Sequence, residues 1–234
     1  MTTRRAGLRE RKKQATREAL REAALKLALE HGPDNVRVDD IAEAAGVSPR
    51  TYNNYFSSRE QAIVAAVTAE REARVAAAVA ARPAHDTLAK AVIEAVVEQY
   101  TDQDDPGPDA LLLITTRTSL REVFIDSATA IEHPLTDAIA DRLGDPPDNT
   151  DRHTARVLAA SVAAAVRIAL EQWVQPATIP STTGAPSTTA GPPTTADSPT
   201  TGRLVVLSGS LPDLLRKALA PLTPALDAAE HHQR

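Results

Sequence analysis

Polar side chains are concentrated in a short segment of the N-terminal quarter, directly after the dipeptide Ser48-Pro49. Within it, Arg50 carries a guanidinium whose paired donors match the two acceptors that guanine presents in the major groove of DNA. Asn53 and Asn54 carry amides that can pair with adenine in the same two-bond manner. The segment therefore has side chains suited to a surface that reads base edges.

The same segment also has side chains suited to the phosphate backbone. Thr51 and Tyr55 carry hydroxyl groups that can donate to phosphate oxygens and so fix the register of a protein on DNA. Arg37 precedes the segment and Arg59 follows it, and both could neutralise phosphates. The predicted DNA-contacting residues are Arg37, Ser48, Pro49, Arg50, Thr51, Asn53, Asn54, Tyr55 and Arg59.

Two short helices separated by a turn would hold this surface. A first helix is predicted over residues 38–45, and Gly46 follows it as the turn residue. Ser48 and the proline after it are typical of an N-cap and a first helical position, so they open a second helix over 49–56. Residues 37–56 therefore have the pattern of a helix-turn-helix, whose second helix enters the major groove.

The charge distribution favours a polyanionic partner at the N-terminal end. The whole chain of 234 residues has a net charge of −5, but residues 1–60 hold 12 basic and 9 acidic residues. Residues 61–234 hold 14 basic and 22 acidic residues, and eight basic residues lie within 4–21 alone. A basic end on an acidic protein is typical of a nucleic-acid-binding face, although a solvated tail has the same composition. Residues 1–13 are predicted to be a basic flexible arm.

An all-α fold is predicted for the rest of the chain. Aromatic residues make up 3% of the sequence, and the apolar residues recur at helical spacing without an alternating strand pattern. The predicted helices span residues 9–31, 38–45, 49–56, 59–81, 86–101, 110–126, 133–143, 151–174 and 204–222. Residues 176–202 are rich in Pro, Thr and Ser and are predicted to be a disordered linker, and 224–234 a weakly structured tail.

Residues 41–63, IAEAAGVSPRTYNNYFSSREQAI, resemble the DNA-binding domain of the TetR/AcrR family of transcriptional regulators. The preceding pattern from Ala24 to Gly32 resembles the first helix of that domain. The family commonly has Thr where this chain has Arg37, and aromatic residues where it has Ala28 and Pro33. Asn53 and Asn54 also depart from the usual aromatic or basic pair, so no operator preference is carried over.

The resemblance implies a domain order and a function. It implies a DNA-binding domain over residues 14–74, a helical ligand-binding and dimerisation domain over 75–175, and an interface helix over 203–223. The implied function is that of a homodimeric repressor, which binds double-stranded operator DNA and is released by a small-molecule effector. A regulator of the same fold that ignores ligands or activates transcription remains an alternative, as does an architectural protein that binds DNA without sequence preference.

Two further sets of residues are candidates for these roles. Polar or aromatic residues inside apolar helices are candidates for the effector pocket: Gln99, Tyr100, Thr115, Thr118, Arg121, Phe124 and Trp173. Each could instead belong to the core, to a solvated surface, or to a helix whose threonines bond back to the backbone. Small or apolar residues on the last two long helices are candidates for the dimer interface, with a monomeric core as the alternative: Ala159, Ala160, Ala163, Ala164, Ala165, Leu204, Val205, Leu207, Leu211, Leu214, Leu215 and Leu219.

Several other classes of protein lack support. The chain has no cysteine, its six histidines show no metal-ligand spacing outside the tail, and it has neither a phosphate-binding glycine loop nor a nucleophile elbow. We therefore expect no enzyme, no cofactor and no metal. The absence of an 18-residue apolar run and of a signal-like N-terminus leads us to expect a cytoplasmic protein without a membrane span.

Overall fold

The computed structural model describes residues 2–68, 71–101, 108–144, 152–175 and 209–231, and every regular element within these ranges is a helix. The α-helices are α1 (Thr2–His31), α2 (Val38–Ala44), α3 (Pro49–Tyr52), α4 (Arg59–Val67), α5 (Arg71–Ala81), α6 (Leu88–Thr101), α7 (Pro108–Thr116), α8 (Thr118–Asp126), α9 (Glu132–Leu143), α10 (His153–Trp173), α11 (Leu211–Leu219) and α12 (Thr223–His231). Three short 3-10 helices are η1 (Pro33–Asn35), η2 (Ser127–Ile131) and η3 (Ala220–Leu222). The predicted all-α class is confirmed, while the predicted linker over 176–202 lies outside the described residues.

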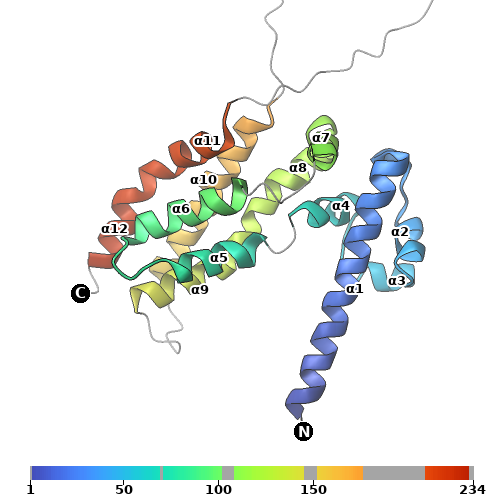
Figure 1. Cartoon of the computed structure of the whole chain (residues 1–234), viewed down its shortest axis with the longest axis horizontal. Coiled ribbons are helices and arrows are strands. Elements are labelled where there is room, and N and C mark those ends of the chain that lie inside the picture. The colour runs from blue at the N-terminus through green and yellow to red at the C-terminus, as the bar shows by residue number, and fades with distance from the viewer. Residues whose placement is uncertain (1, 69–70, 102–107, 145–151, 176–208, 232–234) are drawn as a thin grey trace, which may run out of the picture.

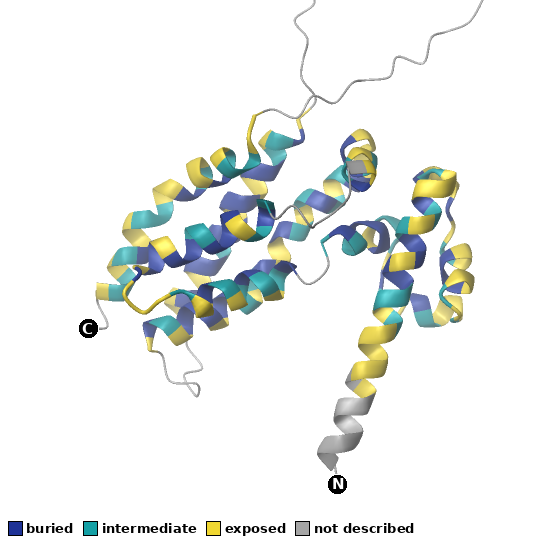
Figure 2. Cartoon of the chain, viewed as in Figure 1, coloured by how far each residue is buried: buried dark blue, intermediate teal, exposed yellow. Residues whose placement is uncertain are grey.

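The helices form two bodies that meet along a narrow junction (Figure 1). In the N-terminal body α1 packs against α2 and α4, and α2 packs against α3. In the C-terminal body α10 packs against α9 and α11, while α5 packs against α6 and α9. The two bodies touch where α4 packs against α8 and α1 contacts α7. Figure 2 shows buried residues on the facing sides of these helices, and the buried apolar residues of the two bodies belong to one hydrophobic core.

The first helix is longer than predicted. Residues 2–8, expected as part of a flexible arm, continue α1, which extends away from the rest of the molecule at its N-terminal end (Figure 1). Residues 9–14, which join this stretch to the packed part of α1, are all Arg, Lys, Gln or Glu, and all four are good helix formers. Because adding a residue to an existing helix avoids the cost of nucleation, the packed part of α1 supports the exposed part.

The predicted helix over 59–81 is divided into α4 and α5. The hydroxyl of Thr68 donates to the carbonyl of Val64 at 3.1 Å, and Thr68 has φ −106° and ψ 12°, outside the helical region. A threonine that bonds back to the preceding turn favours a bend or an end of a helix. α5 then begins at Arg71, the first described residue after Thr68.

The predicted helix over 110–126 is divided at Arg117, which has an extended conformation with φ −108° and ψ 119°. Thr115 and Thr116 both donate their hydroxyls to carbonyls of the preceding turn, of Leu111 and Leu112 among others. Two consecutive back-bonded threonines weaken the helix just before the break. Arg117 also pairs with Asp34 of η1 at 3.2 Å, which links the two bodies at this point.

The C-terminal segment differs from the prediction in two ways. Within the described residues, α11 begins at Leu211, with Pro212 in its first turn, whereas the sequence predicts a helix that begins at residue 204. The expected loose tail is the helix α12, whose Leu226 is fully buried. Asp227 and Glu230 accept the backbone N–H groups of Ala89 and Leu88 at the start of α6, at 3.4 and 3.0 Å. These carboxylates satisfy donors that the helix itself leaves free, so tertiary contacts order a weakly apolar segment.

The helix α10 is apolar enough to cross a membrane by length and composition, with a mean hydropathy of 1.3 over its most apolar window. Half of that window is buried inside the fold, where it packs against α9, α11 and η2. The core helix of a water-soluble protein has the same composition and the same packing. The described helices therefore provide no argument for a membrane protein.

Candidate nucleic-acid interface

The turn between α2 and α3 is built as the sequence predicts. Gly46 has φ 68°, a left-handed conformation that a residue with a side chain rarely adopts. Ser48 caps α3, since its hydroxyl accepts the backbone N–H of Thr51 at 3.1 Å and lies 2.9 Å from the hydroxyl of that residue. Below the turn, Ile41 and Tyr52 are fully buried and hold the two helices together. α3 is thereby fixed on the surface at a defined angle to α2.

The outward side of α3 is polar and open to solvent. The predicted DNA-contacting residues on and around it are exposed or half-buried, with the buried Tyr52 and Phe56 on the opposite side. The exposed members are Ser48, Pro49, Arg50, Asn53 and Asn54, and the half-buried ones are Thr51 and Tyr55. The structure thus gathers seven of the nine predicted residues on one surface. A surface of this kind can insert a short polar helix into the major groove.

The two flanking arginines have different positions. Arg37 is exposed at the start of α2, where its backbone N–H donates to the Asp40 carboxylate at 3.0 Å. Arg59 instead points inward: its Nη1 donates to the carbonyls of Asp34 and Val36 at 3.0 and 2.9 Å. These bonds make Arg59 a tie between α4 and η1, which is a role that the sequence did not indicate.

The inward position of Arg59 is reinforced by its neighbour Glu60. The Arg59 Nε donates to the Glu60 carboxylate at 2.8 Å. Burial raises the pKa of this carboxyl, but the hydrogen bond and the charge of Arg59 outweigh burial, so the pKa lies below its usual value. Glu60 is therefore ionised at neutral pH and holds the guanidinium against the protein.

A basic groove lies between α1 and α3. It has a volume of about 700 Å³ and is lined on the α1 side by Arg9, Lys12, Lys13 and Thr16, and on the α3 side by Thr51, Asn54 and Tyr55. The three cations are exposed and face the polar surface of α3 across this groove. A phosphate strand entering the groove would meet cations on one wall and hydroxyl or amide donors on the other. The sequence placed Arg9, Lys12 and Lys13 both in a basic arm over 1–13 and in a helix predicted over 9–31, and the structure holds them on α1, facing the base-reading surface.

Replacing Lys12 and Lys13 together by glutamine should weaken binding to any duplex and flatten its dependence on salt. If each lysine neutralises one phosphate, the slope of log K against log salt should fall by about 2 in magnitude. Fluorescence anisotropy of a labelled duplex at several salt concentrations measures that slope. The matched control is Lys26→Gln, because Lys26 is an exposed cation on the same helix outside the groove. An unchanged slope in the double variant would remove the groove from the DNA contact.

A second cavity lies at the junction of the two bodies, and we call it the interdomain cavity. Its volume is about 350 Å³, within the lower part of the range typical of small-molecule sites. α1 and α4 line one side of it, and α5, α6, α8 and η2 line the other. The residues that matter for its chemistry are Arg17, Arg21, Val64, Arg71, Tyr100 and Ile131. A ligand in this cavity would touch the DNA-binding helices and the C-terminal body at once.

Of the seven residues predicted for an effector pocket, Tyr100 lines the interdomain cavity and the other six do not. Phe124 is buried in the core, and Trp173 is half-buried against it. Thr115 is buried with its hydroxyl bonded back to α7. Gln99 accepts a hydrogen bond from Arg74 at 3.2 Å.

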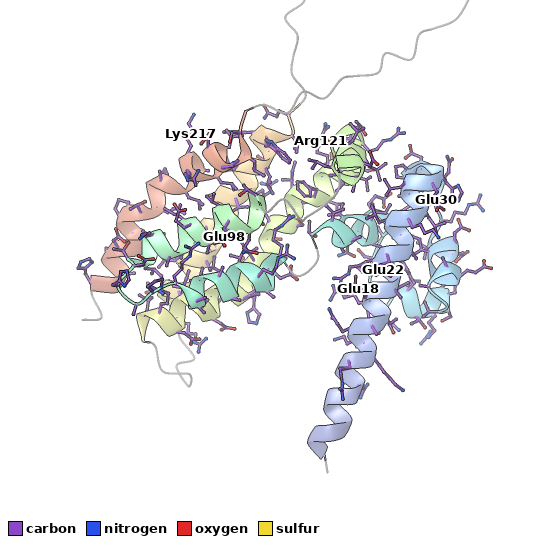
Figure 3. The ribbon with its side chains drawn as sticks, in the orientation of Figure 1. Glu18, Glu22, Glu30, Glu98, Arg121 and Lys217 are labelled. Atoms are coloured by element: carbon purple, nitrogen blue, oxygen red, sulfur yellow. The ribbon has the colours of Figure 1, made fainter. Side chains whose placement is uncertain are left out.

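The last two predicted pocket residues lie at the start of α8. Arg121 donates to the hydroxyl of the exposed Thr118 at 3.4 Å. Figure 3 places Arg121 close to α7, at the outer end of α8. The sequence missed the arginines of the cavity because they come from helices that it assigned to other roles. The feature of the sequence that could have indicated them is the presence of cationic residues among the apolar positions of α1 and α5.

This fold and this surface define a helix-turn-helix DNA-binding regulator with a separate helical C-terminal domain. The model of the family described as "Bacterial regulatory proteins, tetR family" matches residues 20–66, and that of the "MftR C-terminal domain" matches residues 82–183. A curated relative, the "HTH-type transcriptional regulator TcmR" of Streptomyces glaucescens, is 32% identical over 176 residues, which cover 71% of this chain and 76% of the relative. The chain belongs to the TetR family of transcriptional regulators. The resemblance predicted from the sequence is confirmed, and so is the class: a DNA-binding transcription factor rather than an enzyme.

Proposed function

We propose that the chain is a homodimeric repressor in the cytoplasm, which binds a two-fold symmetric operator and leaves it when a small-molecule effector binds. One observation carries this proposal: the interdomain cavity is lined by α1 and α4 together with helices of the C-terminal body. α1 also carries the basic groove, and α4 follows directly after α3. A ligand that binds one relative orientation of the two bodies better than another shifts the population toward it. Binding in the cavity would therefore change the position of the base-reading surface.

A face of α10 supports the dimer. Val157, Ser161, Ala164 and Ile168 follow one another at spacings of four, three and four residues, which places them on one side of the helix. Val157 and Ile168 are 49% and 48% exposed, which makes them two of the four exposed large hydrophobic side chains among the described residues. We name Val157, Ser161, Ala164 and Ile168 the α10 face, and we propose a second copy of this chain as its occupant. α11 packs beside α10 and adds the half-buried Leu214.

Leu204, Val205 and Leu207, also predicted for the interface, lie outside the described residues, and the other predicted residues divide between two roles. Ala159, Ala163 and Ala165 are buried within a single chain, and so are Leu215 and Leu219. They stabilise the packing of α10 on its neighbours and are not free to meet a partner. Within the predicted alanine patch, Ala164 lies on the α10 face. The interface that we propose therefore lies on a different side of α10 from the buried Ala159, Ala163 and Ala165.

Dimerisation has a direct consequence for DNA binding. Two copies of α3 can occupy successive major grooves only if their separation is about 34–36 Å, one turn of B-DNA. A two-fold axis through the α10 face would relate the two copies, and an operator with matching symmetry would bind both. A change in the orientation of each N-terminal body would alter this separation and weaken both contacts together.

The proposal is tested by selecting bound sequences from a pool of random duplexes with the purified full chain. We expect an enriched palindrome whose half-sites are one helical turn apart. No enrichment would favour an architectural protein that binds DNA without preference. A reporter gene that carries the selected sequence then shows the direction of regulation. If the chain activates this reporter instead of repressing it, the protein is an activating regulator.

Replacing Arg50 by alanine should weaken binding to the selected operator by about 1–3 kcal/mol, because one set of paired donors to a base edge is lost. Binding to an unrelated duplex should change little, since it depends on phosphate contacts. Anisotropy titrations with both duplexes measure the difference. Lys26→Ala serves as the control cation in the same body, and equal loss on both duplexes would show that Arg50 contacts phosphate instead of a base.

A further inference from the structure

Cationic side chains are buried in the interdomain cavity. Arg21 of α1 and Arg71 of α5 are 5% and 6% exposed, and both line this cavity. Fully buried arginines are rare unless they meet a negative or strongly polar partner. The two come from opposite sides of the junction, one from the DNA-binding body and one from the C-terminal body. The cavity thus holds two guanidinium groups in the path between the domains.

Arg21 has hydrogen-bonding capacity that the chain leaves unused. Its Nη2 pairs with the carboxylate of Glu18, one turn earlier on α1, which Figure 3 labels on the middle of that helix. Its Nε is buried and donates to no acceptor among the described residues. A buried donor without an acceptor costs free energy, and in native structures such groups usually meet a ligand or water. Arg21 therefore points to an acceptor that would enter the cavity.

Arg71 is held by an aromatic ring. Its guanidinium carbon lies 4.8 Å from the centre of the Tyr100 ring, and its Nη2 donates to the Val67 carbonyl at 3.4 Å. Burial raises the pKa of Tyr100 to about 12, in the presence of a smaller opposing effect from Arg71. The Tyr100 hydroxyl is therefore neutral in any cellular pH range and can donate a hydrogen bond. Arg71 and Tyr100 together place a guanidinium group and a phenol on one wall of the cavity.

The negative groups of the cavity are fewer and partly engaged. Glu72 and Asp126 line it, and Asp126 pairs with Arg167 outside it at 3.5 Å. Arg17 adds a third guanidinium at the more exposed side, 5.6 Å from the centre of the Phe56 ring. Of the charged residues that line the cavity, only two are almost fully buried, and both are arginines, one of which is already paired with Glu18. This arrangement disfavours a cationic ligand and favours an anionic one.

The remaining lining shows what else the ligand would carry. Val64 and Ile131 are buried apolar residues that face the cavity, and Phe56 closes one side. Such residues bind the hydrocarbon part of a ligand through burial of apolar surface. A free inorganic ion would leave this surface without a partner.

We propose that the interdomain cavity binds an organic anion, with a compact oxyanion between Arg21 and Arg71 and an apolar body against Val64 and Ile131. Guanidinium groups bind carboxylates and phosphates through paired, charge-assisted hydrogen bonds. An anion between these two arginines would join α1 to α5 and fix the orientation of the DNA-binding body. The inference rests on the proposed function in one respect: this ligand is the effector whose binding releases DNA.

Direct binding is tested by calorimetry with the full chain and no DNA. The probes are 2-naphthoate, 2-naphthyl phosphate and the neutral 2-naphthamide, which share one apolar body and differ in the head group. We expect at least one anion to bind about tenfold more tightly than the amide, because the charged head adds hydrogen bonds to guanidinium. The comparison between the two anions identifies which oxyanion the site takes. Equal binding of anions and amide, or no binding of either anion, would overturn the proposal.

Variants then locate the site. Arg21→Gln should weaken binding of the preferred anion by about tenfold or more and leave the amide unchanged, since only the charged contact is lost. Lys26→Gln removes a charge from the same helix outside the cavity and should have no effect. If Arg21→Gln does not fold, Arg21→Lys replaces it, because lysine keeps the charge but lacks the paired donors. The comparison of the anions with the amide on the wild-type chain tests the proposal without any variant. Unchanged anion binding in a folded Arg21 variant would exclude this cavity.

A separate measurement distinguishes this inference from the proposed function. The preferred anion is added to the complex with the selected operator, and release is followed by anisotropy. A protein that binds the anion but no operator would contradict the proposed function and leave the anion site intact. A protein that binds operator but neither anion would contradict the anion site alone. Anion binding without release would overturn the identity of this ligand as the effector.

Discussion

A chain with both Val157 and Ile168 replaced by aspartate should be a folded monomer that binds the selected operator about 10²–10⁴-fold more weakly, because linkage of two half-site contacts is lost. Both side chains are about half exposed on one side of α10, so the substitutions should cost little within a single chain. In a symmetric interface the same charges would face each other across the two-fold axis and be desolvated.

Sedimentation velocity measures the oligomeric state, and anisotropy measures operator affinity. Leu112→Asp is the control, because Leu112 is a 60% exposed leucine on α7, away from the α10 face. It should leave both the dimer and the affinity unchanged. A double variant that still sediments as a dimer would place the interface on another surface.

Tyr52→Ala should destabilise the N-terminal body by about 3–5 kcal/mol, the usual cost of removing a buried aromatic side chain. Tyr52 is fully buried below α3, with its ring 5.8 Å from that of Phe56, and its hydroxyl donates to the Ser58 carbonyl at 2.8 Å. Operator binding should be lost with it, because this side chain fixes α3 on the helices beneath.

Tyr52→Phe is the matched variant, since it keeps the ring and removes only the hydrogen bond. We expect it to cost about 1–3 kcal/mol, as the Ser58 carbonyl loses its donor. Burial, and to a lesser extent Glu60, raise the pKa of Tyr52 to about 12, so the hydroxyl keeps its proton. The difference in the free energy of unfolding between the wild-type chain and Tyr52→Phe should therefore not vary with pH below about 10. Urea unfolding followed by circular dichroism gives both values, and equal stability of the two variants would contradict the assigned packing.

Local signals in the sequence were sufficient for the DNA-binding elements. Gly46 and Ser48 act through their own backbone and the next few residues, so the turn and the cap could be recognised without tertiary information. The breaks at Thr68 and Arg117 could not, because threonines that bond back to a helix are common in unbroken helices as well. The ordering of α12 depends on the N–H groups of α6, which are more than a hundred residues away in the chain.

The candidate sites show the same division. Exposure of Arg50 and its neighbours on α3 follows from helical periodicity once Tyr52 is taken as core. The direction of Arg59 does not, since its partners are carbonyl groups of η1 that carry no side-chain signal. The interdomain cavity draws on six helical elements, so no stretch of sequence contains its pattern.

The length of α1 gives the molecule a mechanical property. Arg21 stands in the cavity wall, and Lys12, nine residues earlier on the same unbroken helix, stands in the basic groove. At the rise of an α-helix these positions are roughly 14 Å apart along one stiff rod, so a tilt of about 10° at the cavity moves the groove by about 2 Å. A displacement of that size is larger than the range of distances over which a hydrogen bond forms. A small tilt of α1 at the cavity would therefore break the contacts between the basic groove and DNA phosphates.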